Sequence, residues 1–191
     1  MLTTHVARAP TGTETERPVG YPARQILLHW LAAGLIVLAL ASGALSLAHL
    51  PNGPEKILPL RVHVILGCVI GLALVGGRVV RWTAPQPPRM GTGRRGLDRL
   101  ATVVHHVLPV VALAMVGSGL ALAFQANLPA VLFGPNPAAL PADFWQFPPR
   151  LVHAILAKAL MLLVAIHGTG AAFHHLVRKD GGLKRMWFGG V

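Results

Sequence analysis

The sequence is poor in cysteine and in charged side chains, and each shortage excludes a broad class of protein. Cys68 is the single cysteine among 191 residues, which excludes an intramolecular disulfide framework and a cysteine-based zinc site. Only 12% of the residues are charged, whereas 53% are hydrophobic. This composition is too apolar for an ordinary soluble domain and indicates a membrane protein.

Acidic side chains are the scarcest charged group, and their scarcity leaves the chain strongly basic. Six Asp and Glu residues stand against 17 Lys and Arg residues, for a formal net charge of +11. In a soluble protein this excess would suggest nucleic acid as a partner. Here the apolar segments leave no soluble basic domain, so we expect no nucleic-acid partner. Basic residues at the cytoplasmic ends of membrane helices explain the charge better.

Four long apolar blocks dominate the sequence, at about residues 26–47, 60–80, 101–124 and 151–176. Each has roughly the 20 residues needed to cross the hydrocarbon core of a bilayer. Backbone polar groups in lipid must be satisfied within the segment, so each block should be a helix. The sequence therefore predicts an all-α, integral membrane four-helix bundle.

The sequence predicts one membrane domain over residues 23–186, and the segments outside the apolar blocks are expected to be tails and links. Residues 1–22 are polar, lack a signal-peptide core and are expected to form a flexible cytoplasmic tail. Residues 125–149 contain six prolines, too many for a fifth span, and should cap the outer surface. Residues 187–191 would form a short C-terminal tail.

The distribution of Lys and Arg predicts the orientation of the bundle. Thirteen of these residues lie before the first block, between the end of the second block and the start of the third, or after the fourth block, with Arg78 in the last turn of the second block counted among them. Three lie on the opposite side, namely Lys56, Arg61 and Arg150. The positive-inside rule therefore places both termini in the cytoplasm.

Four histidines fall inside the apolar blocks at two matching depths. His29 lies near the inner start of the first block and His63 near the outer start of the second, about 22 Å apart in depth at 1.5 Å per residue. His153 and His167 in the fourth block are fourteen residues apart, so they share one helix face at depths about 21 Å apart. The spacing predicts an outer pair, His63 with His153, and an inner pair, His29 with His167.

Two imidazoles facing each other across a helical bundle suit the axial positions of haem b. No C-x-x-C-H motif is present for covalent haem attachment. A bis-histidine iron has no open site, which favours electron transfer. Small residues near the proposed ligands would leave room for a flat macrocycle: Ala33, Gly67, Gly71, Gly170 and Ala171. Hydrogen bonding between helices, or a zinc or copper site, are the alternative roles for these histidines.

Several other polar residues are candidates for contacts with a quinone or a small anion. His105 and His106 begin the third block at its inner end, and His174 and His175 close the fourth. Imidazoles there could bind a quinone carbonyl or take its protons. Solvated end residues are the simpler interpretation.

Basic side chains near the outer pair are further candidates for anion contacts. Lys158 lies within the fourth block, about 140° round the helix from His153, and is expected to point away from it. Arg61, Lys56 and Arg150 lie near the outer pair, where they could neutralise haem propionates or attract a small anion. Structural anchoring explains these three residues equally well.

Four stretches together resemble one known family. They are "RQILLHWLAAGLIV", "LRVHVILGCVIGLALVGGRVVRWTAPQPP", "HHVLPVVALAMVGSGLAL" and "LVHAILAKALMLLVAIHGTGAAFHHLVRKDGGLKRM". They resemble the bacterial cytochrome b561 family, and in particular its di-haem superoxide oxidase (superoxide:ubiquinone oxidoreductase) members. The resemblance covers about residues 24–186, and the N-terminal extension and the proline-rich segment depart from it.

The resemblance implies a multi-pass protein of the bacterial inner membrane with two haems b. By matching position, His29, His63, His153 and His167 would be the axial ligands. It implies electron transfer from superoxide, or another small periplasmic donor, to ubiquinone in the quinone pool. One alternative is a cytochrome b anchor subunit that exchanges electrons with a partner dehydrogenase or hydrogenase. Another is a non-redox membrane protein, such as a transporter.

Overall fold

The computed structural model describes residues 20–88, 91–134 and 139–189. Apart from its last three residues, the predicted tail over 1–22 lies outside this part of the chain, as do the final two residues. The described residues are helical, with no strand among them. The long helices are α1 (Ala23–Ala41), α2 (Pro54–Thr83), α3 (Arg95–Gln125) and α5 (Pro148–Phe173).

Short helical segments extend or connect these four. A π-helical turn, η1 (Ser42–Leu47), continues α1, and another, η2 (His174–Arg178), continues α5. The short helix α4 (Leu128–Phe133) lies in the proline-rich segment, and a 3₁₀ turn, η3 (Lys184–Met186), lies near the C-terminus. All four long helices, α1 and α5 together with their π-helical extensions, are long and apolar enough to cross a membrane, as predicted.

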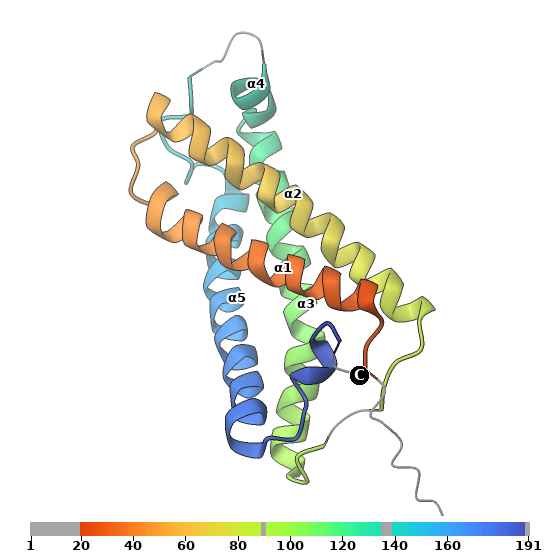
Figure 1. Cartoon of the computed structure of the whole chain (residues 1–191). Helices are drawn as coiled ribbons and strands as arrows, with labels where there is room; N and C mark the ends of the chain where they lie inside the picture. The colour runs from red at the N-terminus through yellow and green to blue at the C-terminus, as the bar shows by residue number, and fades with distance from the viewer. Residues whose placement is uncertain (1–19, 89–90, 135–138, 190–191) are drawn as a thin grey trace, which may run out of the picture.

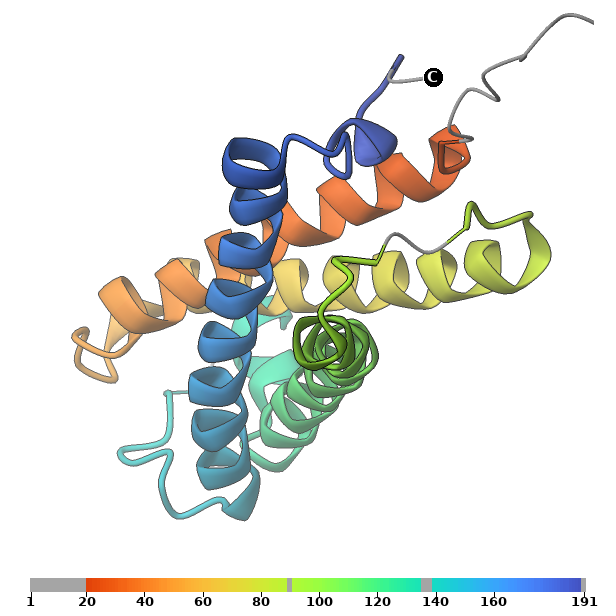
Figure 2. The same cartoon turned by 90° about the horizontal axis from the view of Figure 1, so that it is seen from below.

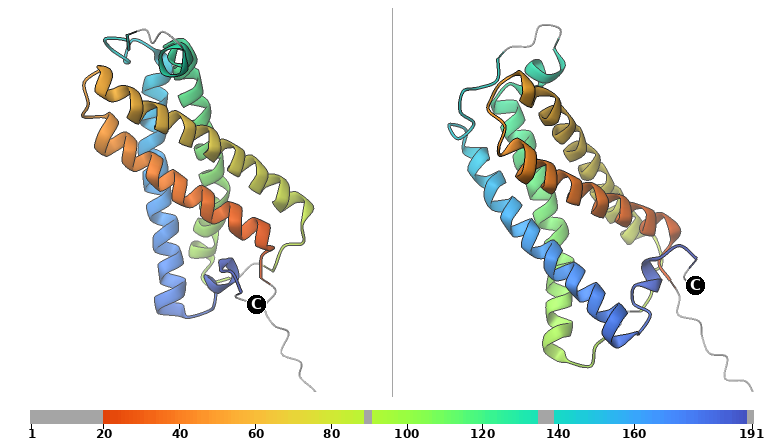
Figure 3. Two further views of the ribbon diagram at one scale, coloured as in Figure 1. Left: turned by 45° about the horizontal axis from the view of Figure 1, so that its top comes forward. Right: turned by 60° about the vertical axis from the view of Figure 1, so that its left-hand side comes forward.

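The helices form two antiparallel pairs that cross at a steep angle. The most extensive packing joins α1 to α2 and α3 to α5, and α2 also packs on α3. Figures 1 and 3 show α1 and α2 side by side across the pair made by α3 and α5. In Figure 2, α1 and α2 are seen lengthwise, while α3 is seen nearly along its axis.

The two ends of the bundle are built differently. We name as outer the end that carries α4 and the link between η1 and α2, at the top of Figure 1. The inner end holds the start of α1 and the C-terminal segment, which are joined by a hydrogen bond from Tyr21 N–H to the Arg185 carbonyl oxygen, 3.2 Å. These names follow the orientation predicted from the basic residues.

Proline sets the first turn of several helices. Pro54, Pro129 and Pro148 lie at the first or second position of α2, α4 and α5, where the missing N–H has no intrahelical partner to lose. Pro59 and Pro109 lie inside α2 and α3, and both helices continue through them. The helices α2 and α3 begin before and end after the predicted apolar blocks. Their added turns carry polar and aromatic residues typical of the membrane interface.

Large apolar side chains cover the outside of the bundle. Leu72, Val110 and Leu162 are exposed by 74%, 65% and 62%, and each lies in the middle of a long helix. A surface this apolar would aggregate in water, so it indicates contact with lipid. The four helices and this surface together describe a multi-pass membrane protein.

Where the two helix pairs cross, one buried residue from each long helix meets in an apolar layer. The layer consists of Ile36, Ile70, Ala112 and Leu160. Leu160 is seven residues from both His153 and His167, which places the layer about 10 Å from each at 1.5 Å per residue. The crossing therefore lies halfway between the two histidine depths.

The proline-rich segment closes the outer end with a second buried cluster. Leu128, Val131 and Leu132 of α4 pack with Ala123, Ala126 and Leu140, and Leu132 is only 1% exposed. Asn52 donates side-chain hydrogen bonds to the carbonyl oxygens of Pro141 and Ala142, at 3.1 and 2.9 Å. These contacts fasten the described part of the segment to the start of α2.

Candidate functional site

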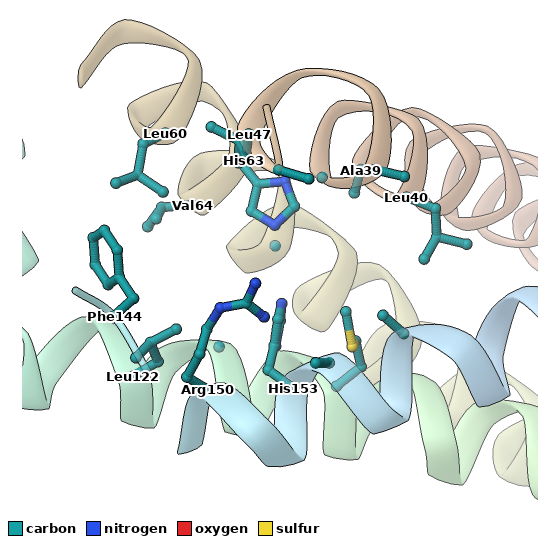
Figure 4. Close-up of a pocket in the computed structure, with 18 of the residues that line it drawn as sticks. Ala39, Leu40, Leu47, Leu60, His63, Val64, Leu122, Phe144, Arg150 and His153 are labelled. Atoms are coloured by element: carbon teal, nitrogen blue, oxygen red, sulfur yellow. The ribbon is translucent and has the colours of Figure 1, made fainter. Parts of the chain in front are cut away.

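The structure brings the predicted outer pair of histidines together. His63 extends from α2 and His153 from α5, with ring centres 6.3 Å apart and ring planes inclined by 76°. Figure 4 shows a ring nitrogen of each residue directed toward the other ring. The helices that carry them belong to different antiparallel pairs, so the crossing of the pairs creates this juxtaposition.

The predicted inner pair is arranged in the same way. His29 of α1 and His167 of α5 have ring centres 6.1 Å apart and planes inclined by 69°. A third imidazole, His105 of α3, lies 5.2 Å from His167 at 86°, and its Nδ1 is 2.6 Å from the carbonyl oxygen of Ala101. The inner site therefore contains three histidines rather than two.

The spacing within each pair fits one metal held between two rings. A first-row metal binds an imidazole nitrogen at about 2.0 Å, and that nitrogen lies about 1.1 Å from its ring centre, so two opposed rings would be about 6.2 Å apart. The observed separations of 6.1 and 6.3 Å match this value. The 5.2 Å between His105 and His167 is too short for opposed coordination, so His105 is not the matching partner.

A cavity of about 450 Å³ lies beside the outer pair. His63 and His153 line it, and the apolar layer at the crossing forms its inner limit. Its size falls in the range of about 300–1,000 Å³ that is typical of cofactor pockets. Apolar side chains form most of the wall, which suits a porphyrin, and Figure 4 shows Leu40, Leu47 and Val64 around the rings.

Two glycines lie close to the outer histidine rings, but they are not the glycines that the sequence analysis singled out. An added Cβ at Gly119 would lie 3.0 Å from His153 Cε1, and one at Gly43 would lie 3.5 Å from His63 Cε1. Gly67 does line the cavity, with open space beside it. At Gly71 an added Cβ would meet Val116 at 3.2 Å, so this glycine serves the packing of α2 on α3 instead.

Two serines that the sequence analysis missed hold the outer imidazoles. Ser42 Oγ is 2.8 Å from His63 Nδ1, and Ser118 Oγ is 3.1 Å from His153 Nδ1. Both outer rings thereby use Nδ1 within the protein and leave Nε2 for the cavity. In the sequence, both serines could have been found as a serine next to a glycine within an apolar block, in "ASGAL" and "VGSGL".

Three basic side chains line the outer cavity. Lys56 is only 8% exposed, and its Nζ donates to Asn52 Oδ1 at 2.8 Å. Arg150 stacks over the Trp145 ring at 4.3 Å and, in Figure 4, reaches toward the space between the histidines. Lys158 is also among the residues that line the cavity, although its side chain is exposed.

Arg61 takes a different position from the other outer cations. Its guanidinium lies 5.7 Å from the centre of the Phe133 ring in α4, and it is not among the residues that line the cavity. Arg61 therefore packs against α4 and is not part of the cavity wall.

The inner end carries a polar cluster centred on Asp180. His174 Nδ1 donates to Asp180 Oδ2 at 2.6 Å, Arg178 Nε donates to the same oxygen at 3.2 Å, and the Gly182 N–H donates to Oδ1 at 3.0 Å. Burial alone would raise the pKa of Asp180, but these hydrogen bonds outweigh burial and hold the pKa below its usual value. His174 is thus engaged with a carboxylate, and it is not adjacent to the outer pair.

An ordinary metal-ion site does not fit this arrangement. Within residues 20–88, 91–134 and 139–189, no three His, Cys, Asp or Glu side chains gather in a way that could hold a bare ion. Structural zinc needs four such ligands and catalytic zinc three. Two opposed imidazoles beside an apolar cavity instead suit iron whose other four ligands come from a porphyrin.

Comparison with known proteins identifies the same class. The profile of the prokaryotic cytochrome b561 family matches residues 20–189. Cytochrome b562 of Cereibacter sphaeroides is 28% identical, over 90% of this chain and 97% of its own. The probable superoxide oxidase CybB of Yersinia pestis is 26% identical, over 87% of this chain and 94% of its own. Cytochrome b561 homolog 1 of Escherichia coli K12 is 26% identical, over 85% and 93%.

No solved structure matches the chain significantly. The family assignment therefore rests on the profile, which spans nearly all of the described residues, and on a bundle whose apolar exterior and paired imidazoles suit a membrane haem protein. This chain belongs to the prokaryotic cytochrome b561 family and is a membrane protein of electron transfer that binds b-type haem.

Proposed function

We propose that the chain holds two haems b and carries electrons from superoxide, at the periplasmic face of the bacterial inner membrane, to ubiquinone. The observation that carries this proposal is the pair of imidazole sites at opposite ends of one bundle, each with the ring separation that a shared metal requires. Bound haem iron supplies one-electron oxidation and reduction, and bis-histidine ligation leaves no open coordination site.

The four histidines are the proposed axial ligands. His63 and His153 would hold the outer haem, and His29 and His167 the inner one. The apolar layer between them excludes water from the middle of the bundle. The predicted orientation, with both termini in the cytoplasm, turns the outer cavity toward the periplasm.

The cations of the outer cavity support an anionic donor. Lys56, Arg150 and Lys158 line it together, and a cleft with one sign of charge and apolar walls concentrates ions of the opposite sign. Superoxide is a small anion that gives up one electron to become oxygen. The similarity to a relative named as a probable superoxide oxidase points to the same donor.

Two superoxide anions would become two oxygen molecules, and ubiquinone would take up the two electrons with two protons. His105, beside the inner pair, and His174, paired with Asp180, are the proposed contacts for the quinone or for its protons. Both lie at the inner end of the bundle, so the proposed acceptor lies opposite the proposed donor.

Haem content in single-histidine variants tests the ligand assignment. His29→Ala and His167→Ala should each lose one haem and leave the same spectrum, while His63→Ala and His153→Ala should lose the other. His49→Ala, an exposed histidine at the outer end, is the matched control and should keep both. Any other grouping of the losses would contradict the assignment.

Rapid mixing of superoxide with the oxidised protein tests the donor. Haem reduction should outpace spontaneous dismutation of superoxide, and ubiquinone should then reoxidise the haem. Slower reduction would exclude superoxide as donor. If reduction instead required a co-purifying iron–sulfur subunit, the chain would be an anchor for a partner dehydrogenase or hydrogenase.

A further inference from the structure

The outer imidazoles are held by two serines in nearly identical local geometry. Ser42, at the end of α1, meets His63 of α2, and Ser118 of α3 meets His153 of α5. Each hydroxyl also donates to the carbonyl oxygen three residues earlier in its own helix, Ala39 for Ser42 and Met115 for Ser118, both at 2.9 Å. These are two separate contacts, one between η1 and α2 and one between α3 and α5, and each holds one outer imidazole.

The hydrogen bonds of the two serines favour one tautomer of each outer ring. A serine hydroxyl has one proton, and here that proton goes to the backbone carbonyl. A hydroxyl that donates to this carbonyl accepts from histidine, which favours the tautomer with the proton on Nδ1 in each ring. The other nitrogen, Nε2, is then unprotonated and presents its lone pair to the cavity, which is the form that binds a metal.

The backbone around both serines is adapted to these contacts. The helix becomes π-helical at Ser42, an irregularity often found at functional sites, and the next residue, Gly43, lies against His63. Ser118 is only 9% exposed and is followed by Gly119, which lies against His153. A serine–glycine pair faces each outer ring, one from η1 and one from α3.

The inner pair is built without such partners. Among the hydrogen bonds of the described residues, none involves the ring of His29 or His167, although the rings of His105 and His174 do take part in such bonds. A ring N–H bonded to an acceptor makes a metal-bound imidazole more electron-rich. An electron-rich ligand favours ferric over ferrous iron, so the serines would affect the outer site and not the inner one.

We propose that Ser42 and Ser118 are positioning residues that lock the outer imidazoles in their iron-binding form and lower the reduction potential of the outer haem alone. This inference rests on the proposed function, because it requires a haem between His63 and His153. Removing one hydroxyl should shift the reduction equilibrium of that haem roughly threefold to tenfold toward the reduced form. For a one-electron couple, tenfold corresponds to about 59 mV.

A protein that keeps only the outer haem gives the cleanest measurement. His29→Ala supplies this background, and Ser42→Ala and Ser118→Ala are added singly and together. Spectroscopic redox titration of the purified membrane protein then reports one haem. Ser46→Ala is the matched control, because Ser46 lies one turn beyond Ser42 in η1 and, among the hydrogen bonds of the described residues, its hydroxyl bonds to neither ring.

A higher potential in both serine variants, with Ser46→Ala unchanged, supports the proposal, and unchanged potentials overturn it. If the alanine variants lose the outer haem, its potential is measured in Ser42→Thr and Ser118→Thr instead, since threonine keeps the hydroxyl. Haem retention at the original potential in the threonine variants supports the proposal, and equal loss overturns it. A His29→Ala protein with no haem would instead contradict the proposed two-haem function before the serines are tested.

Discussion

Gly119 offers the sharpest test of the outer site, because one added methyl group there would press directly on a proposed ligand. In Gly119→Ala the new Cβ would lie 3.0 Å from His153 Cε1 and 3.4 Å from its Nδ1. Ordinary contacts begin at 3.4 Å, so the ring must move by at least about 0.4 Å. A metal site tolerates displacements of roughly 0.5 Å, so the ligand would reach the edge of productive geometry.

The same displacement strains the contact between Ser118 and His153, which is already 3.1 Å long. Disturbing an outer-shell partner of a metal ligand typically weakens binding about 10- to 100-fold. We expect the lower end, roughly tenfold faster loss of the proposed outer haem, because a single methyl group moves the ring without removing it. The proposed inner haem should be unaffected.

Transfer of haem from the purified protein to an excess of an apo-acceptor protein measures this rate. Gly117→Ala is the control, because it makes the same change two residues away in α3, where an added Cβ has no atom within 4 Å. Both variants gain the roughly 0.5–1 kcal/mol that alanine brings to a helix interior, so the comparison isolates the contact with His153. Equal rates in Gly119→Ala and Gly117→Ala would refute the geometry described for the outer site.

Three further predictions concern charge and electronic structure. Asp180→Asn should lower the melting temperature at neutral pH, because folding lowers the pKa of Asp180. The contribution of Asp180 to stability is present above its unfolded pKa of about 3.9 and is lost as pH falls through its folded pKa. The melting temperatures of the two proteins should therefore converge at that low pH. Lys56→Gln should slow haem reduction by superoxide and flatten its dependence on ionic strength, whereas Arg81→Gln at the inner end should do neither. With imidazole planes inclined by 69° and 76°, two d orbitals of each proposed haem iron would be nearly degenerate, so both ferric haems should give strongly anisotropic low-spin electron paramagnetic resonance signals. Rhombic signals of the kind seen with parallel rings would contradict these inclinations.

The sequence was sufficient to predict the features that depend on one helix at a time. Block length and hydropathy gave four spans, because the bilayer sets both. Depth along each span follows from the constant helical rise, and so the sequence indicated which histidines could meet. The structure brings together those same pairs, His63 with His153 and His29 with His167.

Features that depend on how two helices cross could not be predicted from the sequence. Ser118 and Gly119 reach His153 only because α3 packs along α5, and nothing in the spacing within α3 indicates that packing. The same limit explains why Gly71, one of the small residues singled out, serves helix packing.

The four side chains at the crossing, Ile36, Ile70, Ala112 and Leu160, also bear on what else can traverse this protein. They offer no hydroxyl, amide or carboxylate to a hydronium ion, while a tunnelling electron needs no such relay over about 20 Å between the two histidine levels. In the proposed arrangement negative charge would move inward with no proton accompanying it through the bundle. Each turnover would then work against the resting membrane voltage, so the rate in energised vesicles should rise when an ionophore collapses that voltage.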